Sequence, residues 1–465
     1  GKATLEGATA QTRVWDVTDA ADIRRVVTSE PNTQGQISWN TRRDNSKAEY
    51  VAWTPGSSMP SVELAATVPN QNLHGLETPD MVIITLPQWR QYAESLANLH
   101  RTDPQNLDVL VVTDNECFNE FSGGTPDINA VRRMLKMFWD RGGGTSDGKD
   151  SKLRYALMFG RAMYDHRGIT PEARQIKNNI LLQWQSQESG SSSTSFTTED
   201  YLAFLLDGSG AKFGTDRLCI AVGRIPVSSE SEAAVSVEKI RRYMADEHRS
   251  EWKNRIVMAT DDGNYGDHID QMEKVYTEFM STTGGLQNVY HKVYVDAFPL
   301  INGQTPDAHD RMWRLLNQGA IWWWYIGHAS TTSWTAEGLL TIDDIHNARF
   351  TNPPMLFAAT CNFLRWDTPD ESGAETLFFN ENGIIGAIAA TRPVYIGLNE
   401  RMCKALASAI SATVGAGRRV PIGELLQNAK NTLISSSGDD NKLRYVLLGD
   451  PAMPLSNTTY RAIIE

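Results

Sequence analysis

The sequence predicts an α/β fold in which two parallel, Rossmann-like sheets follow each other in tandem behind a β-rich segment. From Pro79 onward, apolar runs of strand length alternate with segments of helical period, and a second such series begins at Arg255. Before Pro79 the chain has short β-like runs and no long helical period. We therefore expect a β-rich N-terminal segment at 1–78, a first subdomain at 79–226 and a second subdomain at 227–465.

The first series predicts three strands with helices between them, followed by a further strand and helix. The expected strands are 81–86, 107–113, 153–159 and 217–225, and the expected helices are 88–100, 128–139 and 230–248. A polar stretch from Gln185 to Thr198 contains Gly and three consecutive serines, which is typical of a surface loop. It is a candidate cover for a site, although a passive loop is the more ordinary interpretation.

The second series carries the chemistry. The expected strands are 255–260, 289–295, 320–329, 353–362 and 383–391, and the expected helices are 269–280, 308–317 and 339–350. A right-handed strand-helix-strand crossover would place the strand at 320–329 beside the strand at 353–362.

His328 and Cys361 each close one of these two apolar strands. Because the carboxyl ends of parallel strands meet at one sheet edge, an imidazole and a thiol would lie close together there. This pair is the minimum equipment for acyl transfer by a cysteine nucleophile, since a thiol beside an imidazole gives the reactive thiolate. Taken alone, each residue is more often structural: a hydrogen-bonding histidine and a buried cysteine.

The same chemistry needs hydrogen-bond donors for the oxyanion and a group that orients the histidine. The backbone N–H groups of Cys361 and Ala329 are the expected donors. Asp262, at the end of another strand, is the candidate orienting acid, although it also fits an Asp-Gly turn with a solvated carboxylate. Asp267 precedes a helix, so an N-cap is its ordinary interpretation.

Composition and charge indicate which classes of partner and cofactor to expect. The net charge is -12 and the pI is about 5.3, with Lys and Arg scattered, so nucleic acid is not expected and a polypeptide substrate fits better. No apolar run approaches the roughly 20 residues that span a bilayer. No dinucleotide or phosphate loop is present, so no cofactor is required.

Metal binding is weakly indicated. The four cysteines, at 117, 219, 361 and 403, are far apart, so zinc is not expected and the three other than Cys361 are interpreted as buried apolar residues. The acidic clusters Asp343-Asp344 and Asp367 to Glu371 are candidates for structural calcium, with solvated loops as the more ordinary interpretation.

Several motifs together make the chain resemble the gingipain family of cysteine peptidases, which belongs with caspases in one clan. They are Gly-His-Ala-Ser at 327–330, Ala-Thr-Cys at 359–361, Gly-Arg-Ile-Pro at 223–226 and Leu-Leu-Gly-Asp-Pro at 447–451. The likeness covers roughly residues 79 to 460 and implies a caspase-like peptidase unit.

Within the family, the chain looks most like a surface sortase of the type IX secretion system, on account of Ala-Thr-Cys-Asn-Phe at 359–363 and Thr-Arg-Pro-Val-Tyr at 391–395. This implies removal of the C-terminal secretion signal of cargo proteins and transfer of the new C-terminus to an anionic lipopolysaccharide. It also implies a location at the exterior of a Gram-negative outer membrane or in the medium, with secretion-system outer-membrane proteins as partners.

The resemblance assigns roles residue by residue. Cys361 matches the nucleophile, His328 the catalytic histidine, and Asp262 a glutamate near that histidine. Substrate-binding candidates are Asp267, near the acid that receives arginine in Arg-cutting members, Trp334 and Tyr395. This sequence departs from the family in having Ala329 where gingipains have glycine, and an aspartate where they have the longer glutamate.

Two alternatives stay open. One is a gingipain-like endopeptidase that cuts after Arg or Lys. The other is a non-catalytic binding module that has kept the fold. An acyl-enzyme is common to peptidase and sortase, so the sequence does not separate hydrolysis from transfer.

Overall fold

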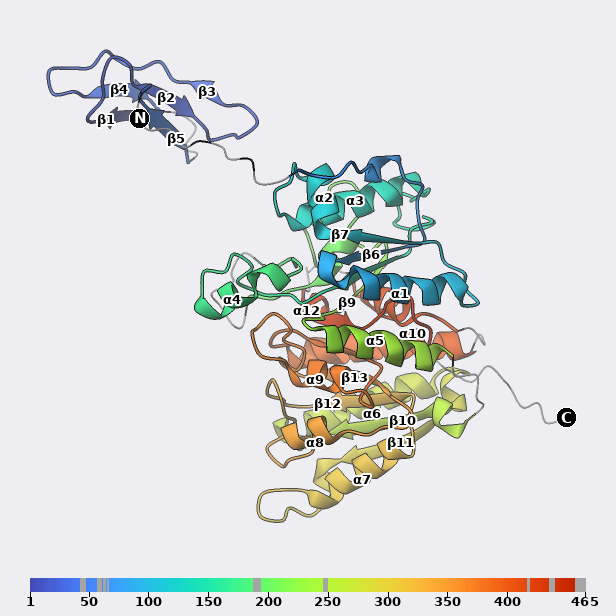
Figure 1. The fold of residues 1–465 in the computed structure, drawn as a ribbon. Coiled ribbons are helices and arrows are strands. Elements are labelled where there is room, and N and C mark those ends of the chain that lie inside the picture. Colours follow the sequence, from blue (N-terminus) through green and yellow to red (C-terminus); the bar gives the residue numbers. More distant parts are fainter. Residues whose placement is uncertain are drawn as a thin grey trace. The chain divides into compact units, whose positions relative to one another are not determined.

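The computed structural model describes residues 1–41, 47–56, 61, 64, 67–186, 194–245, 250–415, 419–434 and 440–455. By its contacts the chain divides into two units, Gly1–Asn70 and Gln71–Glu465 (Figure 1). The expected subdomain boundary at 226 falls inside the second unit and stays a prediction. The expected loop Gln185 to Thr198 lies partly outside the described residues, so its role as a cover also stays a prediction.

The N-terminal unit consists of two small antiparallel sheets. One pairs β1 (Lys2–Leu5) with β4 (Ile37–Asn40), and the other has the order β3 (Arg24–Arg25), β2 (Arg13–Asp16) and β5 (Tyr50–Trp53). Alternate residues such as Val14, Ile37 and Trp39 are buried and form its small core. The predicted β-rich N-terminal segment is confirmed.

The second unit is built on one ten-stranded sheet. Its strand order is β11 (Val289–Tyr294), β10 (Arg255–Thr260), β12 (Trp322–Ile326), β13 (Met355–Ala359), β14 (Gly386–Ala390), β15 (Tyr445–Leu448), β9 (Ala221–Ile225), β8 (Tyr155–Phe159), β6 (Met81–Thr85) and β7 (Val109–Thr113). The strands β10 to β14 are parallel to one another, and so are β6 to β9. The predicted α/β class is confirmed, and the two expected sheets form one continuous layer.

The strand β15 joins the two halves. It pairs antiparallel with β14 and meets β9 at one residue pair, Leu448 with Arg224. The sequence analysis did not predict this strand, because its four residues are too few for a periodic signal. A strand from the end of the chain therefore closes the gap between sheets built from earlier segments.

The helices of the second unit lie on both faces of the sheet (Figure 1). They are α1 (Arg90–Thr102), α2 (Asp114–Phe121), α3 (Ile128–Arg141), α4 (Pro171–Ile176), α5 (Glu230–Met244), α6 (Asp267–Met280), α7 (Pro306–Asn317), α8 (Ile342–Asn347), α9 (Gly373–Phe379), α10 (Ile396–Gly415), α11 (Ile422–Thr432) and α12 (Asn441–Arg444). The helix predicted at 339–350 is shortened to α8, because Thr341 caps its N-terminus and the backbone leaves the helical region at Ala348.

The strand β6 shows why both faces are covered. Met81 and Ile83 belong to the core that includes α1, whereas Val82 and Ile84 belong to the core that includes α3. Since successive side chains of a strand point to opposite faces, a strand that is apolar at every position must be covered on both sides.

The Gly-Arg-Ile-Pro and Leu-Leu-Gly-Asp-Pro motifs form the contact between β9 and β15. A Cβ atom on Gly223 would lie 2.5 Å from the carbonyl oxygen of Gly449, so a larger residue does not fit. The buried Arg224 pairs with Glu199 and donates to the carbonyls of Gly160 and Leu182. These motifs therefore hold the two halves of the sheet together.

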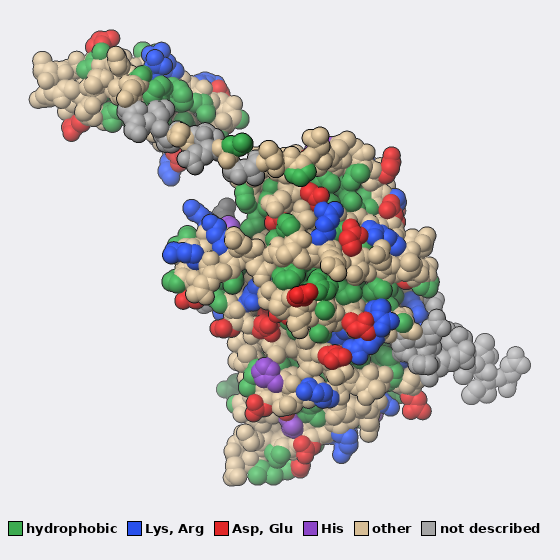
Figure 2. Space-filling model, viewed as in Figure 1, with side chains coloured by type: hydrophobic (Ala, Val, Ile, Leu, Met, Phe, Trp, Pro, Cys, Tyr) green, Lys and Arg blue, Asp and Glu red, His purple; other side chains and the backbone are tan. Residues whose placement is uncertain are grey.

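The surface of the described residues carries mixed charge. On the face drawn in Figure 2, acidic and basic side chains are interspersed, and the picture shows no basic stripe there. In the part of the chain that the structure describes, no helix has both the length and the apolar character needed to cross a bilayer.

The buried pair His100 and Asp450 ties the end of α1 to the turn after β15. His100 Nε2 lies 2.6 Å from Asp450 Oδ2, and neither side chain is exposed. Burial alone would lower the pKa of His100, but the charges of Asp450 and Asp103 and the hydrogen bonds to them outweigh it and raise this pKa to about 10.

We expect His100→Gln to lower the free energy of unfolding by about 3–5 kcal/mol, because it leaves the Asp450 carboxylate buried without a cation. A raised histidine pKa contributes stability that is fully present below about pH 6.5 and is lost as the pH rises toward 10. The difference between wild type and variant should therefore shrink over that interval. Urea unfolding followed by tryptophan fluorescence measures it, with the exposed His346→Gln as control, and a difference that does not change with pH would contradict it.

Candidate active site

The register of β12 and β13 places His328 beside Cys361. The strands are parallel, Ile326 pairs with Ala359, and the N–H of Gly327 donates to the Ala359 carbonyl at 3.4 Å. His328 and Cys361 each lie two residues beyond that last pair, so the alternation of the strands carries both to the same side. His328 is exposed and Cys361 is half-buried, so both are within reach of solvent.

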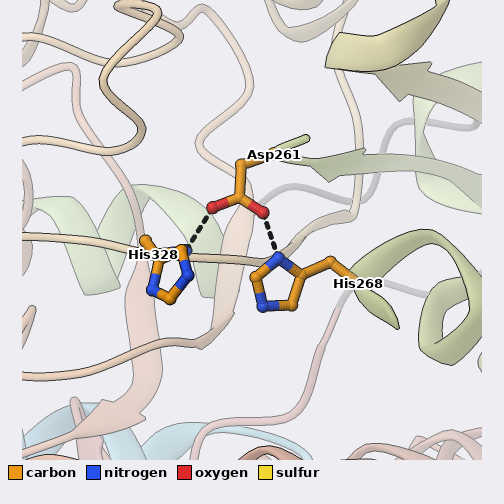
Figure 3. A group of neighbouring side chains, drawn as sticks. All are labelled: Asp261, His268 and His328. Carbon is orange, nitrogen blue, oxygen red and sulfur yellow. Dashed lines mark hydrogen bonds and ion pairs between the residues drawn. The ribbon is translucent and has the colours of Figure 1, made fainter. Parts of the chain in front are cut away.

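Asp261 connects the ends of β10 and β12. One oxygen of its buried carboxylate accepts the backbone N–H of His328 at 2.6 Å (Figure 3). The other bonds to Nδ1 of His268 and accepts the N–H of Gly263 at 3.3 Å. The carboxylate therefore fixes the backbone that carries His328, and it places a negative charge close to that imidazole.

His268, in the first turn of α6, is the second histidine of the site. Its Nε2 lies 3.1 Å from the amide nitrogen of Asn264, which can only donate, so Nε2 accepts and Nδ1–H donates to Asp261. The ring lies edge-on to the His328 ring, with centroids 5.0 Å apart and an interplanar angle of 78°. His268 thus forms one wall for the His328 ring.

Gly263 and Gly327 lie so close to His328 and Asp261 that neither position has space for a side chain. A Cβ on Gly263 would lie 2.9 Å from Cδ2 of His328, and a Cβ on Gly327 would lie 2.8 Å from Cγ of Asp261. The segment after Gly263 is strained at Asn264 and Tyr265, which both have a positive φ. The side chain of Tyr265 is fully exposed.

Trp334 and Tyr325 support the carbonyl side of His328. The two rings stack at 4.0 Å with an interplanar angle of 4°, and the Tyr325 hydroxyl donates to the His328 carbonyl at 2.6 Å. Trp334 is fully buried, and its expected contact with substrate stays a prediction. Its ring packs in the core against the rings of Trp323, Tyr325 and Phe363.

The sulfur of Cys361 faces the loop that follows β14. The N–H of Val394 lies 3.5 Å from Sγ, a donor that stabilises a thiolate. Asn362, directly after the cysteine, has φ 58°, so the chain turns sharply at this point. Tyr395, a predicted substrate-binding residue, is exposed on the same loop, next to Val394.

A buried ion pair holds the two loops together. Arg392, after β14, donates through both terminal nitrogens to the carboxylate of Asp367, at 2.8 and 2.5 Å. The other half of the sheet also contacts this loop, because Arg161 donates to the Thr368 carbonyl at 2.7 Å and Gln183 accepts from Trp366 at 3.2 Å. Residues from both halves therefore position the loop that carries Cys361.

The other three cysteines are unlike Cys361. Cys117, Cys219 and Cys403 are buried, and burial raises the pKa of each thiol. This is the placement the sequence analysis expected for them.

The two predicted acids lie at the rim of the site. Asp262 is exposed, and in the described part of the chain it makes no hydrogen bond to His328. Burial and then the charge of Asp262 raise the pKa of Asp296. Its role as orienting acid stays a prediction. Asp267 is exposed in the first turn of α6, behind Gly266 as the N-cap, so it is not the cap itself.

Sequence reasoning missed Asp261 and His268. Asp261 and Asp262 are adjacent at the end of β10, and only the position of the strand decides which carboxylate turns inward. The available signal was the pair of Asp261 and His268, seven residues apart across a strand-to-helix turn.

The predicted oxyanion donors also stay predictions. In the described residues, the N–H groups of Cys361 and Ala329 donate to no protein acceptor, so both are free for a ligand.

Among the described residues, one cluster could hold a metal ion: Asp261, His268 and His328, with ligand atoms within 4.8 Å of one another. Hydrogen bonds between its own members already account for the closeness of these groups. Of the calcium candidates, Asp344 bonds to Thr341 and His309, and Asp367 to Arg392, so both carboxylates are engaged. Structural calcium stays a prediction.

Comparison with known proteins matches residues 74–456 to the model described as Peptidase family C25. The fold is similar to that of the Arg specific cysteine proteinase gingipain R (RGPB), with 15% identity and a TM-score of 0.61 over 84% of this chain and 81% of that one. It is also similar to dimeric latent PorU from Porphyromonas gingivalis, with 23% identity and a TM-score of 0.57 over 98% of this chain but 37% of that chain. A search of curated proteins gave no match.

We expect iodoacetamide to alkylate Cys361 well before Cys117, Cys219 and Cys403, because Cys361 alone among the four is partly exposed and the N–H of Val394 lies against its sulfur. Peptide mass spectrometry after brief labelling measures this. Equal labelling of all four cysteines in folded protein would contradict the described geometry.

We expect Asp261→Asn to destabilise the protein by about 1–3 kcal/mol and to slow alkylation of Cys361. The His328 N–H and His268 face different oxygens of the carboxylate, and in asparagine one of these oxygens is replaced by an NH2 group, which cannot accept. Asp262→Asn is the matched control, since it makes the same change one residue away at an exposed position. Thermal unfolding and labelling rates compare them. A larger effect of Asp262→Asn would instead identify Asp262 as the orienting acid.

Proposed function

Because the chain belongs to peptidase family C25, we propose that it acts on polypeptides through an acyl-enzyme, with Cys361 as nucleophile and His328 as acid and base. The family resemblance drawn from the motifs is confirmed by the family match and by the fold. The roles of individual residues are part of the proposal.

One observation carries the proposal: the register of β12 and β13 brings an accessible imidazole and the one cysteine that is not buried to the same edge of the sheet. A structural histidine and an inert cysteine would have no need of this placement. The N–H of Val394 against Sγ further supports a thiolate at Cys361.

In the proposed reaction, His328 takes the proton of the Cys361 thiol and the sulfur attacks a peptide carbonyl. The N–H groups of Cys361 and Ala329 would receive the oxyanion, and each such donor contributes on the order of 10²–10³ in turnover. His328 returns the proton to the leaving amine, a contribution of about 10²–10⁴ in rate, and a thioester remains on Cys361. The carboxylate of Asp261 accepts the backbone N–H of His328 and so holds this residue in place during both proton transfers.

The acceptor of the acyl group decides between a peptidase and a sortase. Water gives hydrolysis, and an amine on a glycan gives transfer. The sequence motifs at 359–363 and 391–395, and similarity to latent PorU over 98% of this chain, support the sortase. We accordingly propose removal of the C-terminal signal of type IX cargo and transfer to an anionic lipopolysaccharide, at the cell surface and beside outer-membrane proteins of the secretion system.

The second candidate is an endopeptidase that cuts after Arg or Lys. The exposed carboxylates of Asp262 and Asp267 at the rim favour it, because a basic side chain of the substrate needs such partners. Gingipain R, whose fold is similar, is described as Arg specific.

We expect wild-type protein to form a covalent adduct at Cys361 with a peptide from a type IX cargo C-terminus, and the mass of the adduct gives the cleavage site. His328→Ala should reduce adduct formation by about 10²–10⁴, since no base remains to take the thiol proton. Cys361→Ala should form none. Alkylation of Cys361 that does not respond to His328→Ala, with no adduct, would favour the non-catalytic binding module.

Substrate and acceptor are tested with matched peptides that carry Arg, Lys or a small residue before the cut. Efficient cleavage after arginine would reject the sortase in favour of the endopeptidase. For a sortase, added hydroxylamine or an amino sugar should divert the acyl group from water, and mass spectrometry distinguishes the acid from the amide product.

A further inference from the structure

A cavity lies beside the loops that carry Cys361 and Val394. Its volume is about 460 Å³, and residues from both halves of the sheet line it. Arg365, Asp370 and Arg392 come from the loops after β13 and β14, and Tyr164 and Thr197 come from the other half. The proposed mechanism uses none of these side chains.

Arg365 brings to this cavity a positive charge that has no ion-pair partner among the described residues. Among the described residues, its guanidinium makes no hydrogen bond or ion pair, and its Nε is buried without a partner. The neighbouring Arg392 is different, because Asp367 neutralises it through two hydrogen bonds. A buried donor without a partner destabilises the folded protein, and a ligand that accepts from it would remove that cost.

Thr197 supplies a second unpaired group. It lines the cavity and is 1% exposed, and its hydroxyl is buried in the wall without a hydrogen-bond partner among the described residues. Its backbone carbonyl is engaged, since it accepts from the hydroxyl of Thr391 at 3.0 Å. The cavity thus offers a guanidinium and a hydroxyl, both of which donate, and this combination selects an oxygen anion.

The position and charge of the cavity indicate which anion. Arg365 is four residues beyond Cys361, and Arg392 is two residues before Val394, so the cavity is lined by the same two loops that carry the nucleophile and its N–H donor. Asp370, exposed and also in the lining, partly offsets the charge of Arg365. One net positive charge at most fits a monoanion better than a dianionic phosphate.

We propose that this cavity is a substrate subsite in which Arg365 and Thr197 bind the side-chain carboxylate of an Asp or Glu near the cut. The inference rests on the proposed function, because it assumes that the polypeptide bound at Cys361 continues into the cavity. It makes Arg365 a determinant of specificity and leaves the reaction itself unchanged.

The test uses fluorogenic peptides that carry either Glu or Gln at one position, with that position moved along both sides of the cut. At one position the wild type should prefer Glu over Gln by about 10-fold in kcat/KM, as expected for a hydrogen-bonded charge pair. Arg365→Gln should bring that ratio close to one, and Arg365→Lys should lower it partly because lysine lacks the planar fork. Arg311→Gln, at an exposed position on α7, is the control and should keep the ratio.

A second variant and a binding measurement keep the outcome clear. Thr197→Val removes the hydroxyl at nearly the same volume and should also lower the Glu-to-Gln ratio. It replaces Arg365→Gln as the test if that variant does not fold. Fluorescence anisotropy with the Cys361→Ala variant measures the same Glu-to-Gln ratio without catalysis. A preference in binding without any turnover in the wild type would reject the proposed function and support the subsite.

Two results would overturn the proposal. One is the absence of a Glu preference at every position, or a preference that survives both Arg365→Gln and Thr197→Val. The other is displacement of the labelled peptide by inorganic phosphate at lower concentration than by the Glu peptide, which would assign the cavity to a phosphorylated ligand.

Discussion

The parallel pairing of β12 with β13 is the constraint on which the site depends. Both strands are buried along their whole length, and backbone hydrogen bonds hold Ile326 level with Ala359. A slip of one residue would turn every side chain of one strand to the opposite face, so the packing of the core fixes the register strongly. Two residues farther on, the same register decides that an imidazole and a thiol share one edge.

A single carboxylate then converts this placement into a defined geometry. Because Thr260 pairs with Ile326, Asp261 emerges beside the N–H of His328 and can accept it. Its second oxygen engages His268 and so attaches α6 to the same point. Burial makes these bonds costly to break, which suits a residue that positions the histidine without being exposed to substrate.

The loop that carries Cys361 is held in place by contacts with the loop after β14 and with the other half of the sheet. Asp367 and Arg392 join the loops after β13 and β14, and Arg161 reaches the first of these loops from the end of β8. The strand β15 makes those contacts possible, since it closes the sheet between the two halves. The motifs around Gly223 and Asp450 lie where the two halves of the sheet join. They support the site indirectly, because the loop that carries Cys361 is positioned by residues from both halves.

The sequence by itself determined the alternation of strands and helices, the α/β class and the choice of His328 and Cys361, because apolar periodicity and the polar residue after each strand are local properties of the chain. It named Asp262 as the orienting acid and missed Asp261, and it did not show that Trp334 lies buried against Tyr325. Only the tertiary structure decided these points and the place of β15. Each depends on residues far apart in the chain, and packing alone determines which of them meet.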